Sequence, residues 1–223
     1  MLSSELFNPL ILLSKVVILL FAFPLHELAH AVTADRLGDP TPRSQGRITL
    51  NPLAHLDVMG SILLFISFFG WAKPVYTNPR YFRNGPRAGM AIVALAGPAM
   101  NLLLAIIGSL LWRGVIAAQQ ATDFLDLNAI NNLFIFTQVF VSINLYLMLF
   151  NLLPIGMLDG LKVLRGIAPV AWDSFLDQLE RWGMFILLAL IFLPSVAGIN
   201  ILGIILGTPH NLIYSLLMAG VGG

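Results

Sequence analysis

The sequence predicts an all-α polytopic membrane protein, with about five full transmembrane helices, a re-entrant or short membrane segment and a small interfacial β-sheet. Of its 223 residues, 58% are hydrophobic and 10% are charged, and the mean hydropathy is +0.87. Soluble domains are about 45–50% apolar and about 25% charged, so this composition belongs to a different class. Because each spanning helix uses about 20 residues, little sequence is left for a large soluble domain.

The first apolar segment runs from Phe7 to Val32 and continues past Pro24. This is long enough to cross a bilayer. A cleavable secretory signal peptide is the competing interpretation, but such a peptide ends in small residues, whereas this segment leads directly into a polar motif.

The next segment predicts structure at the membrane surface rather than a second crossing. Arg47 to Leu50 alternates polar and apolar residues, as an edge strand does. Met59 to Trp71 is apolar but only 13 residues long, and runs of this length are typical of re-entrant or interfacial segments. Ala72 to Pro79 then predicts extended backbone.

Later apolar runs predict the remaining helices: Ala88 to Leu111, Leu133 to Leu153, Phe185 to Leu206 and Leu212 to Val221. We expect breaks near Pro194 and at Gly207-Thr208-Pro209, because proline interrupts a helix. His210, beside Pro209, is expected to be an exposed turn residue. No internal repeat is evident, so residues 1–223 are taken as one domain, with a core over about 7–165 and C-terminal helices over about 180–221.

Basic residues are concentrated between the first span and the Ala88 span: Arg36, Arg43, Arg47, Lys73, Arg80, Arg83 and Arg87. The connection from Arg113 to Asn132 instead carries Asp123 and Asp126. By the positive-inside rule the basic connection is cytoplasmic and the acidic one external, which places the N-terminus outside. The same rule requires that Met59 to Trp71 does not cross. The net charge of +1 argues against a nucleic-acid partner.

His26-Glu27-Leu28-Ala29-His30 is an H-E-x-x-H motif within the first apolar segment. On a helix the two histidines lie on one face with Cβ atoms about 5–6 Å apart, so both imidazoles can bind one zinc ion, and Glu27 can act as the base on a water molecule. Ionised groups at a bilayer centre cost about 2.5–3.5 kcal/mol each, which favours a functional reason for their presence. A purely structural role for these polar residues would not explain the four-residue spacing of the two histidines.

A zinc site with two histidines needs a third protein ligand, and the chain has no cysteine. Asp57 and Asp159 are the acidic residues at a suitable depth. Asp159 is the better candidate, because the Leu133 to Leu153 span ends on the same side of the membrane as His26, and Pro154, Gly156 and Gly160 allow the chain to turn back.

The sequence resembles the site-2 protease family of intramembrane zinc metalloproteases, and more closely a compact subgroup without PDZ or CBS domains. The resemblance covers about residues 20 to 165 and is carried by three segments in this order: FPLHELAH at 23–30, AGPAMN at 96–101, and NLLP…DG at 151–160. It implies a three-helix catalytic core, one zinc ion per chain bound by His26, His30 and Asp159, Glu27 as general base, and Asn151 holding the substrate backbone. Asn101 is a second candidate for substrate binding, and close helix packing is its alternative role.

The leading hypothesis is an intramembrane zinc endopeptidase that hydrolyses peptide bonds in or near transmembrane segments. The alternative is a membrane metal transporter or channel that uses the same His/Asp cluster, although transport gains little from Glu27 between two ligands. The expected partners are a transmembrane protein substrate, the lipid bilayer and a second copy of the chain. The expected location is a bacterial or archaeal plasma membrane, with the active site toward the cytoplasm.

Overall fold

The computed structural model describes residues 9–67 and 70–219, and in it the first apolar segment forms one continuous helical rod from Pro9 onward, while Phe7 and Asn8 lie outside the described residues. The rod consists of α2 (Pro9–Val17), a π-helical turn (Ile18–Ala22) and α3 (Phe23–Arg36). In the π-helical turn the N–H of Phe23 bonds to the carbonyl of Ile18. Pro24 lies inside this continuous rod, directly after the π-helical turn, and the helix continues past it as predicted.

Between α3 and α6 the chain forms the short helices α4 (Thr41–Ser44) and α5 (Val58–Ser67), and Leu64 of α5 is buried against Ile18 and Leu19 of the first rod. The predicted strand from Arg47 to Leu50 does not form, and no strand is present among residues 9–67 and 70–219. The only β-type pairing recorded there is an isolated antiparallel bridge between Leu56 and Ala72. Arg47 is the physical reason: its side chain is buried and bonds to backbone carbonyls, so it links the segments that a sheet would otherwise join.

Helices α6 (Pro86–Thr122) and α7 (Leu127–Asn151) both begin before the apolar runs that predicted them, and α6 also ends later than its run. At 37 residues α6 is about 55 Å long, whereas a bilayer core is about 30 Å thick. Small residues bring the two helices together: Ala105 is fully buried, and a Cβ on Gly108 would contact Phe140. This is the packing expected where lipid supplies no hydrophobic driving force between helices.

The C-terminal part folds as α8 (Asp159–Ile167), α9 (Asp173–Ala197) and α10 (Ile201–Met218). The break expected near Pro194 occurs a few residues later, and the break expected at Gly207-Thr208-Pro209 is wrong, because both prolines lie inside helices. The chain turns instead at Gly198, whose φ of +69° suits glycine. His210 is also not an exposed turn residue.

His210 is buried in α10 at 6% exposure and stacks on two tyrosine rings, those of Tyr146 and Tyr214. Its imidazole also bonds to the hydroxyl of Ser142 at 2.9 Å. The adjacent Pro209 misled the sequence interpretation, because proline within a membrane helix does not require a turn.

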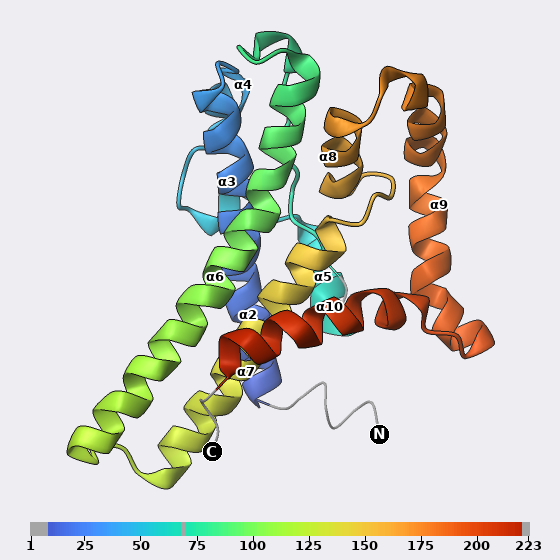
Figure 1. Cartoon of the computed structure of the whole chain (residues 1–223). Coiled ribbons are helices and arrows are strands. Elements are labelled where there is room, and N and C mark those ends of the chain that lie inside the picture. Colours follow the sequence, from blue (N-terminus) through green and yellow to red (C-terminus); the bar gives the residue numbers. More distant parts are fainter. Residues whose placement is uncertain (1–8, 68–69, 220–223) are drawn as a thin grey trace.

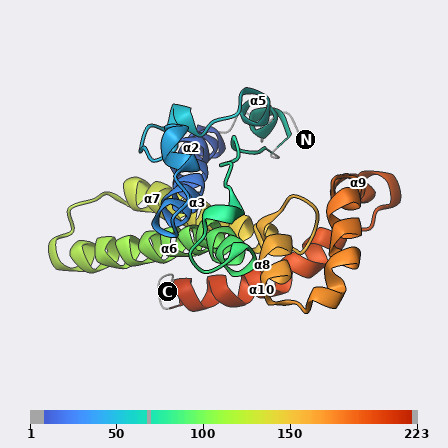
Figure 2. The same ribbon diagram turned by 90° about the horizontal axis from the view of Figure 1, so that it is seen from above.

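Helix α6 is the centre of the arrangement and packs against α3, α7 and α8, while α10 packs on α7. Seen from above, α5 and α9 lie on different sides of this group (Figure 2). The site described below lies where α3, α6 and α8 meet.

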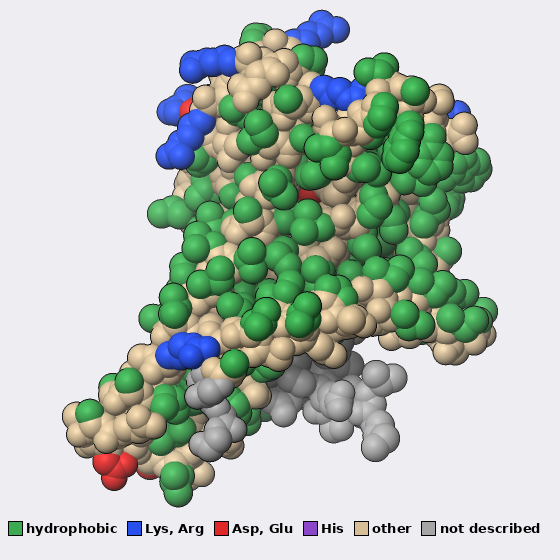
Figure 3. Space-filling view, viewed as in Figure 1, with side chains coloured by type: hydrophobic (Ala, Val, Ile, Leu, Met, Phe, Trp, Pro, Cys, Tyr) green, Lys and Arg blue, Asp and Glu red, His purple; other side chains and the backbone are tan. Residues whose placement is uncertain are grey.

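Four helices in the described part of the chain are long and apolar enough to cross a membrane: Leu12–Arg36, Pro86–Thr122, Leu127–Asn151 and Ile201–Met218. The sequence predicted about five full transmembrane helices, so this part of the expectation is not confirmed. Figure 3 shows a broad hydrophobic surface, with basic side chains gathered at the end formed by α4 and the start of α6. This is the surface of a membrane protein.

Candidate metal centre

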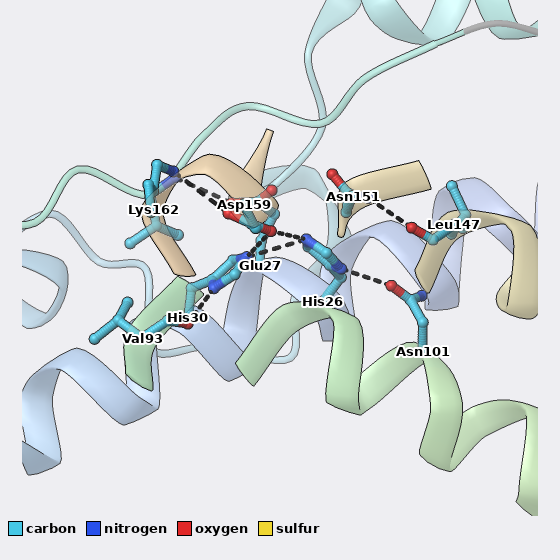
Figure 4. A network of polar contacts seen from close by, with 10 residues as sticks. His26, Glu27, His30, Val93, Asn101, Leu147, Asn151, Asp159 and Lys162 are labelled. Carbon is cyan, nitrogen blue, oxygen red and sulfur yellow. Dashed lines mark hydrogen bonds and ion pairs between the residues drawn. The ribbon is translucent and has the colours of Figure 1, made fainter. Parts of the chain in front are cut away.

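Three side chains from two helices converge on one point between α3, α6 and α8 (Figure 4). His26 and His30 lie one turn apart on α3, with their Nε2 atoms 3.0 Å from each other. Oδ2 of Asp159 lies 3.3 Å from Nε2 of His26 and 3.1 Å from Nε2 of His30. All three residues are buried. Asp159 reaches them because it is the first residue of α8, after a loop in which Gly156 has a φ of +54°.

The spacing of these ligand atoms fits a tetrahedral zinc ion. Zinc binds histidine nitrogen and carboxylate oxygen at about 2.0–2.2 Å, and a tetrahedron of that size separates its ligand atoms by about 3.3 Å. The three separations here are 3.0, 3.1 and 3.3 Å. Three protein ligands would leave the fourth position for water or substrate, as in catalytic rather than structural sites.

Hydrogen bonds on the far side of the His30 ring determine which nitrogen faces the centre. Nδ1 of His30 lies 2.7 Å from the backbone carbonyl of Val93 in α6. A carbonyl only accepts hydrogen bonds, so Nδ1 must donate, and in the neutral ring Nε2 keeps its lone pair. The lone pair therefore points at the converging atoms, which is the tautomer that a metal requires.

Two asparagines determine in the same way which nitrogen of His26 faces the centre. Nδ1 of His26 lies 2.6 Å from Oδ1 of Asn101, Nδ2 of Asn101 lies 3.2 Å from Oδ1 of Asn144, and Nδ2 of Asn144 donates to the Phe140 carbonyl at 2.9 Å. Because the last acceptor is a backbone carbonyl, it fixes the direction of every donor in the chain. His26 thus donates through Nδ1 and presents the lone pair of Nε2 to the centre.

Asp159 supplies the negative charge of the centre. Its Oδ2 faces the Nε2 atoms of both imidazoles, where its charge would complement that of a metal cation. Lys162 contacts the other carboxylate oxygen at 3.4 Å. Metal binding requires the ionised form of this carboxyl group, and the adjacent Lys162 ammonium group favours that form.

Glu27 lies next to the cluster but is not one of its ligands. Its Oε2 accepts a hydrogen bond of 3.0 Å from the backbone N–H of Val75. A half-buried carboxylate beside three metal ligands can exchange a proton with a molecule bound at the open position.

Gly97 provides the space that the two imidazoles occupy. A Cβ at this position of α6 would overlap Nε2 and Cε1 of His30 and Nε2 of His26. The AGPAMN segment thus has two roles, since Asn101 orients His26 and Gly97 leaves room for both rings.

We expect Gly97→Ala to lower zinc affinity by at least about 10-fold, because the added methyl group displaces two ligands. Gly114→Ala is the matched control, since it lies in the same helix and a Cβ there meets nothing within 4 Å. Zinc dissociation constants from chelator competition compare the two. Equal affinities would show that the rings do not need this space.

The structure brings Asp159, and not Asp57, to the two histidines. Oδ1 of Asp57 accepts from the N–H of Gly60 at 2.8 Å, at the start of α5. Asn151 lies at the end of α7, where its amide donates to the Leu147 carbonyl of its own helix at 2.9 Å. Asn101 is fully buried and engaged by His26 and Asn144.

Sequence reasoning missed three groups at this site: Asn144 and the backbone groups of Val93 and Val75. An asparagine in the middle of an apolar span is a usable indication, because buried amides in membrane helices require partners. The two backbone groups carry no such indication, since every residue has a carbonyl and nearly every residue an N–H.

Comparison with known proteins found relatives that are named as putative zinc metalloproteases. The chain is 40% identical over 191 residues to a protein of Bacillus subtilis (strain 168) named "Putative zinc metalloprotease YwhC", with 85% of each chain covered. It is 31% identical over 183 residues to "Putative zinc metalloprotease Rip2" of Mycolicibacterium smegmatis, covering 79% of this chain and 66% of that one. Rip2 of Mycobacterium tuberculosis is 30% identical over 192 residues, with 78% and 64% covered.

No family model and no solved structure matches the sequence. The relatives cover most of this chain and are named as zinc metalloproteases, and the chain itself carries a His/His/Asp cluster formed by an H-E-x-x-H helix and a returning loop. The chain belongs to the site-2 protease family of zinc metalloproteases.

Proposed function

We propose that this protein is an intramembrane zinc endopeptidase that hydrolyses peptide bonds in or near transmembrane segments, with Glu27 as general base. One observation carries the proposal: His26 and His30 lie on α3, within the candidate span Leu12–Arg36, and meet Asp159 in a buried cluster, with Glu27 beside them on the same helix. Metal ligands at this depth serve a substrate that is itself in the membrane. The names of the relatives do not favour the transport alternative.

His26, His30 and Asp159 would hold the zinc ion, which when bound polarises the peptide carbonyl and acidifies water. Glu27 takes the proton from the attacking water and delivers it to the nitrogen of the leaving amine. Asn101 and the Val93 carbonyl keep both imidazoles oriented during these steps.

A transmembrane substrate has to unwind locally, because the peptide bonds of a helix are shielded by their own hydrogen bonds. Asn151 remains the proposed contact for the unwound backbone, since an amide both donates and accepts. For this role its donor would exchange the Leu147 carbonyl for substrate. Direct contact of Asn101 with substrate would likewise require it to release His26.

The proposal is tested by incubating the purified protein with a model substrate that contains one transmembrane helix. We expect cleavage that a zinc chelator abolishes and that added zinc restores. Cleavage that is insensitive to the chelator would exclude the zinc mechanism. Zinc transport into vesicles without any cleavage would favour the alternative function.

We also propose that the N-terminus is external and the active site faces the cytoplasm of a bacterial or archaeal cell. The basic end of the molecule, seen at the top of Figure 3, supports this orientation. The chain has no cysteine, so a single introduced thiol reports its own side of the membrane.

An impermeant thiol reagent is expected to label Phe124→Cys in intact cells and Arg83→Cys only after lysis. Phe124 is an exposed residue of the α6–α7 connection. It is preferable to Asp123, whose φ of +47° strains most side chains. The reverse pattern of labelling would invert the proposed topology.

A further inference from the structure

The connection between α5 and α6 passes directly over the general base. In this connection the N–H of Val75 donates to Oε2 of Glu27 at 3.0 Å, although the two residues are far apart in the sequence. The bond engages one of the two carboxylate oxygens. A carboxylate held through one oxygen has a defined orientation for the other.

The peptide bond that supplies this N–H is itself held from its opposite side. Nη2 of Arg47 donates to the Pro74 carbonyl at 2.6 Å. The carbonyl and N–H of a planar trans peptide point in opposite directions, so the peptide between Pro74 and Val75 joins the Arg47 guanidinium to the Glu27 carboxylate. A cation at the carbonyl polarises the amide and strengthens its N–H as a donor.

Arg47 is buried, and its guanidinium bonds to several backbone carbonyls of this region. Its exposure is 3%, and its guanidinium also donates to the carbonyls of Ala54 and Lys73. In the described part of the chain no carboxylate lies within ion-pair distance of Arg47. A buried guanidinium that is satisfied by backbone carbonyls alone requires those carbonyls to stay in place.

The connection is fixed on both sides of Val75. Before it, the N–H of Lys73 donates to the His55 carbonyl at 2.7 Å. After it, the N–H of Asn78 donates to Oδ2 of Asp39 at 2.6 Å, and Asp39 is fully buried. The N–H of Val75 is thus held between two anchors, as a rigid positioning element requires.

We propose that the backbone N–H of Val75 positions the Glu27 carboxylate for proton transfer, and that Arg47 is the positioning residue that fixes this N–H. The proposal rests on the function proposed above for Glu27. It assigns a role to Arg47, which contacts neither the metal ligands nor Glu27 directly.

Val75→Pro tests the proposal because proline removes the N–H and retains an apolar side chain, and the preceding residue is already a proline. Val75→Ala is the matched control, since it keeps the N–H. We expect kcat to fall about 10- to 100-fold in Val75→Pro, with KM and zinc content near those of the parent. Val75→Ala should retain a kcat well above that of Val75→Pro.

Arg47→Lys is the second variant, because lysine keeps the charge but cannot bond several carbonyls as a planar fork. It should also lower kcat without loss of zinc. Arg43→Lys is its control, since Arg43 is exposed and pairs with Asp35.

Three results would overturn the proposal. An unchanged kcat in Val75→Pro would show that the N–H is not needed, and a raised kcat would show that the connection obstructs the site. Loss of zinc in both Val75→Pro and Arg47→Lys would assign the connection a purely structural role. If Glu27→Gln itself cleaved normally, the proposed function of Glu27 would fail instead, so the two failures are distinguishable.

Discussion

Replacing Glu27 with glutamine is expected to remove peptide cleavage while the protein still binds one zinc ion per chain. The amide has the same size and its oxygen can still accept from the N–H of Val75, so the local geometry is retained. It cannot take a proton from water, and loss of a general base costs about 10²–10⁴-fold in rate. Single-turnover cleavage of a transmembrane substrate and metal analysis of the same sample measure both quantities.

Glu180→Gln is the matched control for this substitution. Glu180 has an exposed side chain that pairs with Arg165, away from the metal centre. Its variant should cleave at the parental rate. Near-normal cleavage by Glu27→Gln would eliminate Glu27 as the base, whereas loss of zinc from that variant would mean that Glu27 supports the metal site.

The second large effect is expected for Asp159→Ala, which should lower zinc affinity by more than about 100-fold and remove activity with it. The substitution deletes the only charged ligand of the cluster and leaves two imidazoles, too few for a catalytic zinc site. Lys162 would also lose its partner. Zinc dissociation constants and metal content of the purified variant test this expectation.

Asp57→Ala separates the two carboxylates that the sequence alone leaves as candidates. Asp57 caps the start of α5 and should be replaceable without loss of zinc, at the cost of about 1 kcal/mol in the stability of that helix. If Asp57→Ala lost zinc and Asp159→Ala kept it, the assignment of the third ligand would be wrong.

Much of the site could be predicted because its components follow local rules. The four-residue spacing of His26 and His30 defines one helix face. Asp159 was predicted from topology, since the first span and the Leu133 to Leu153 span both run from outside to inside and therefore end on the same side of the membrane. The structure places all three together. The prolines and glycines between Asn151 and Asp159 allow the required return of the chain.

The remainder of the site depends on tertiary contacts that local patterns do not encode. Alternation at Arg47 to Leu50 predicted a strand, but the burial of Arg47 against carbonyls of distant segments prevails over local preference. Hydropathy also misplaced the end of α6, because the polar residues up to Thr122 are compatible with a helix beyond the membrane. The bond from Val75 to Glu27 comes from the backbone and has no sequence pattern.

The position of the cleaved bond tests the central claim most directly. The protein and a substrate with one transmembrane helix are reconstituted in lipid vesicles, and the products are identified by mass spectrometry, with Glu27→Gln as the inactive control. A centre on α3 at membrane depth predicts a zinc-dependent cut in the hydrophobic segment or immediately beside it. Cutting confined to distant soluble parts of the substrate, with the transmembrane segment always intact, would contradict the account.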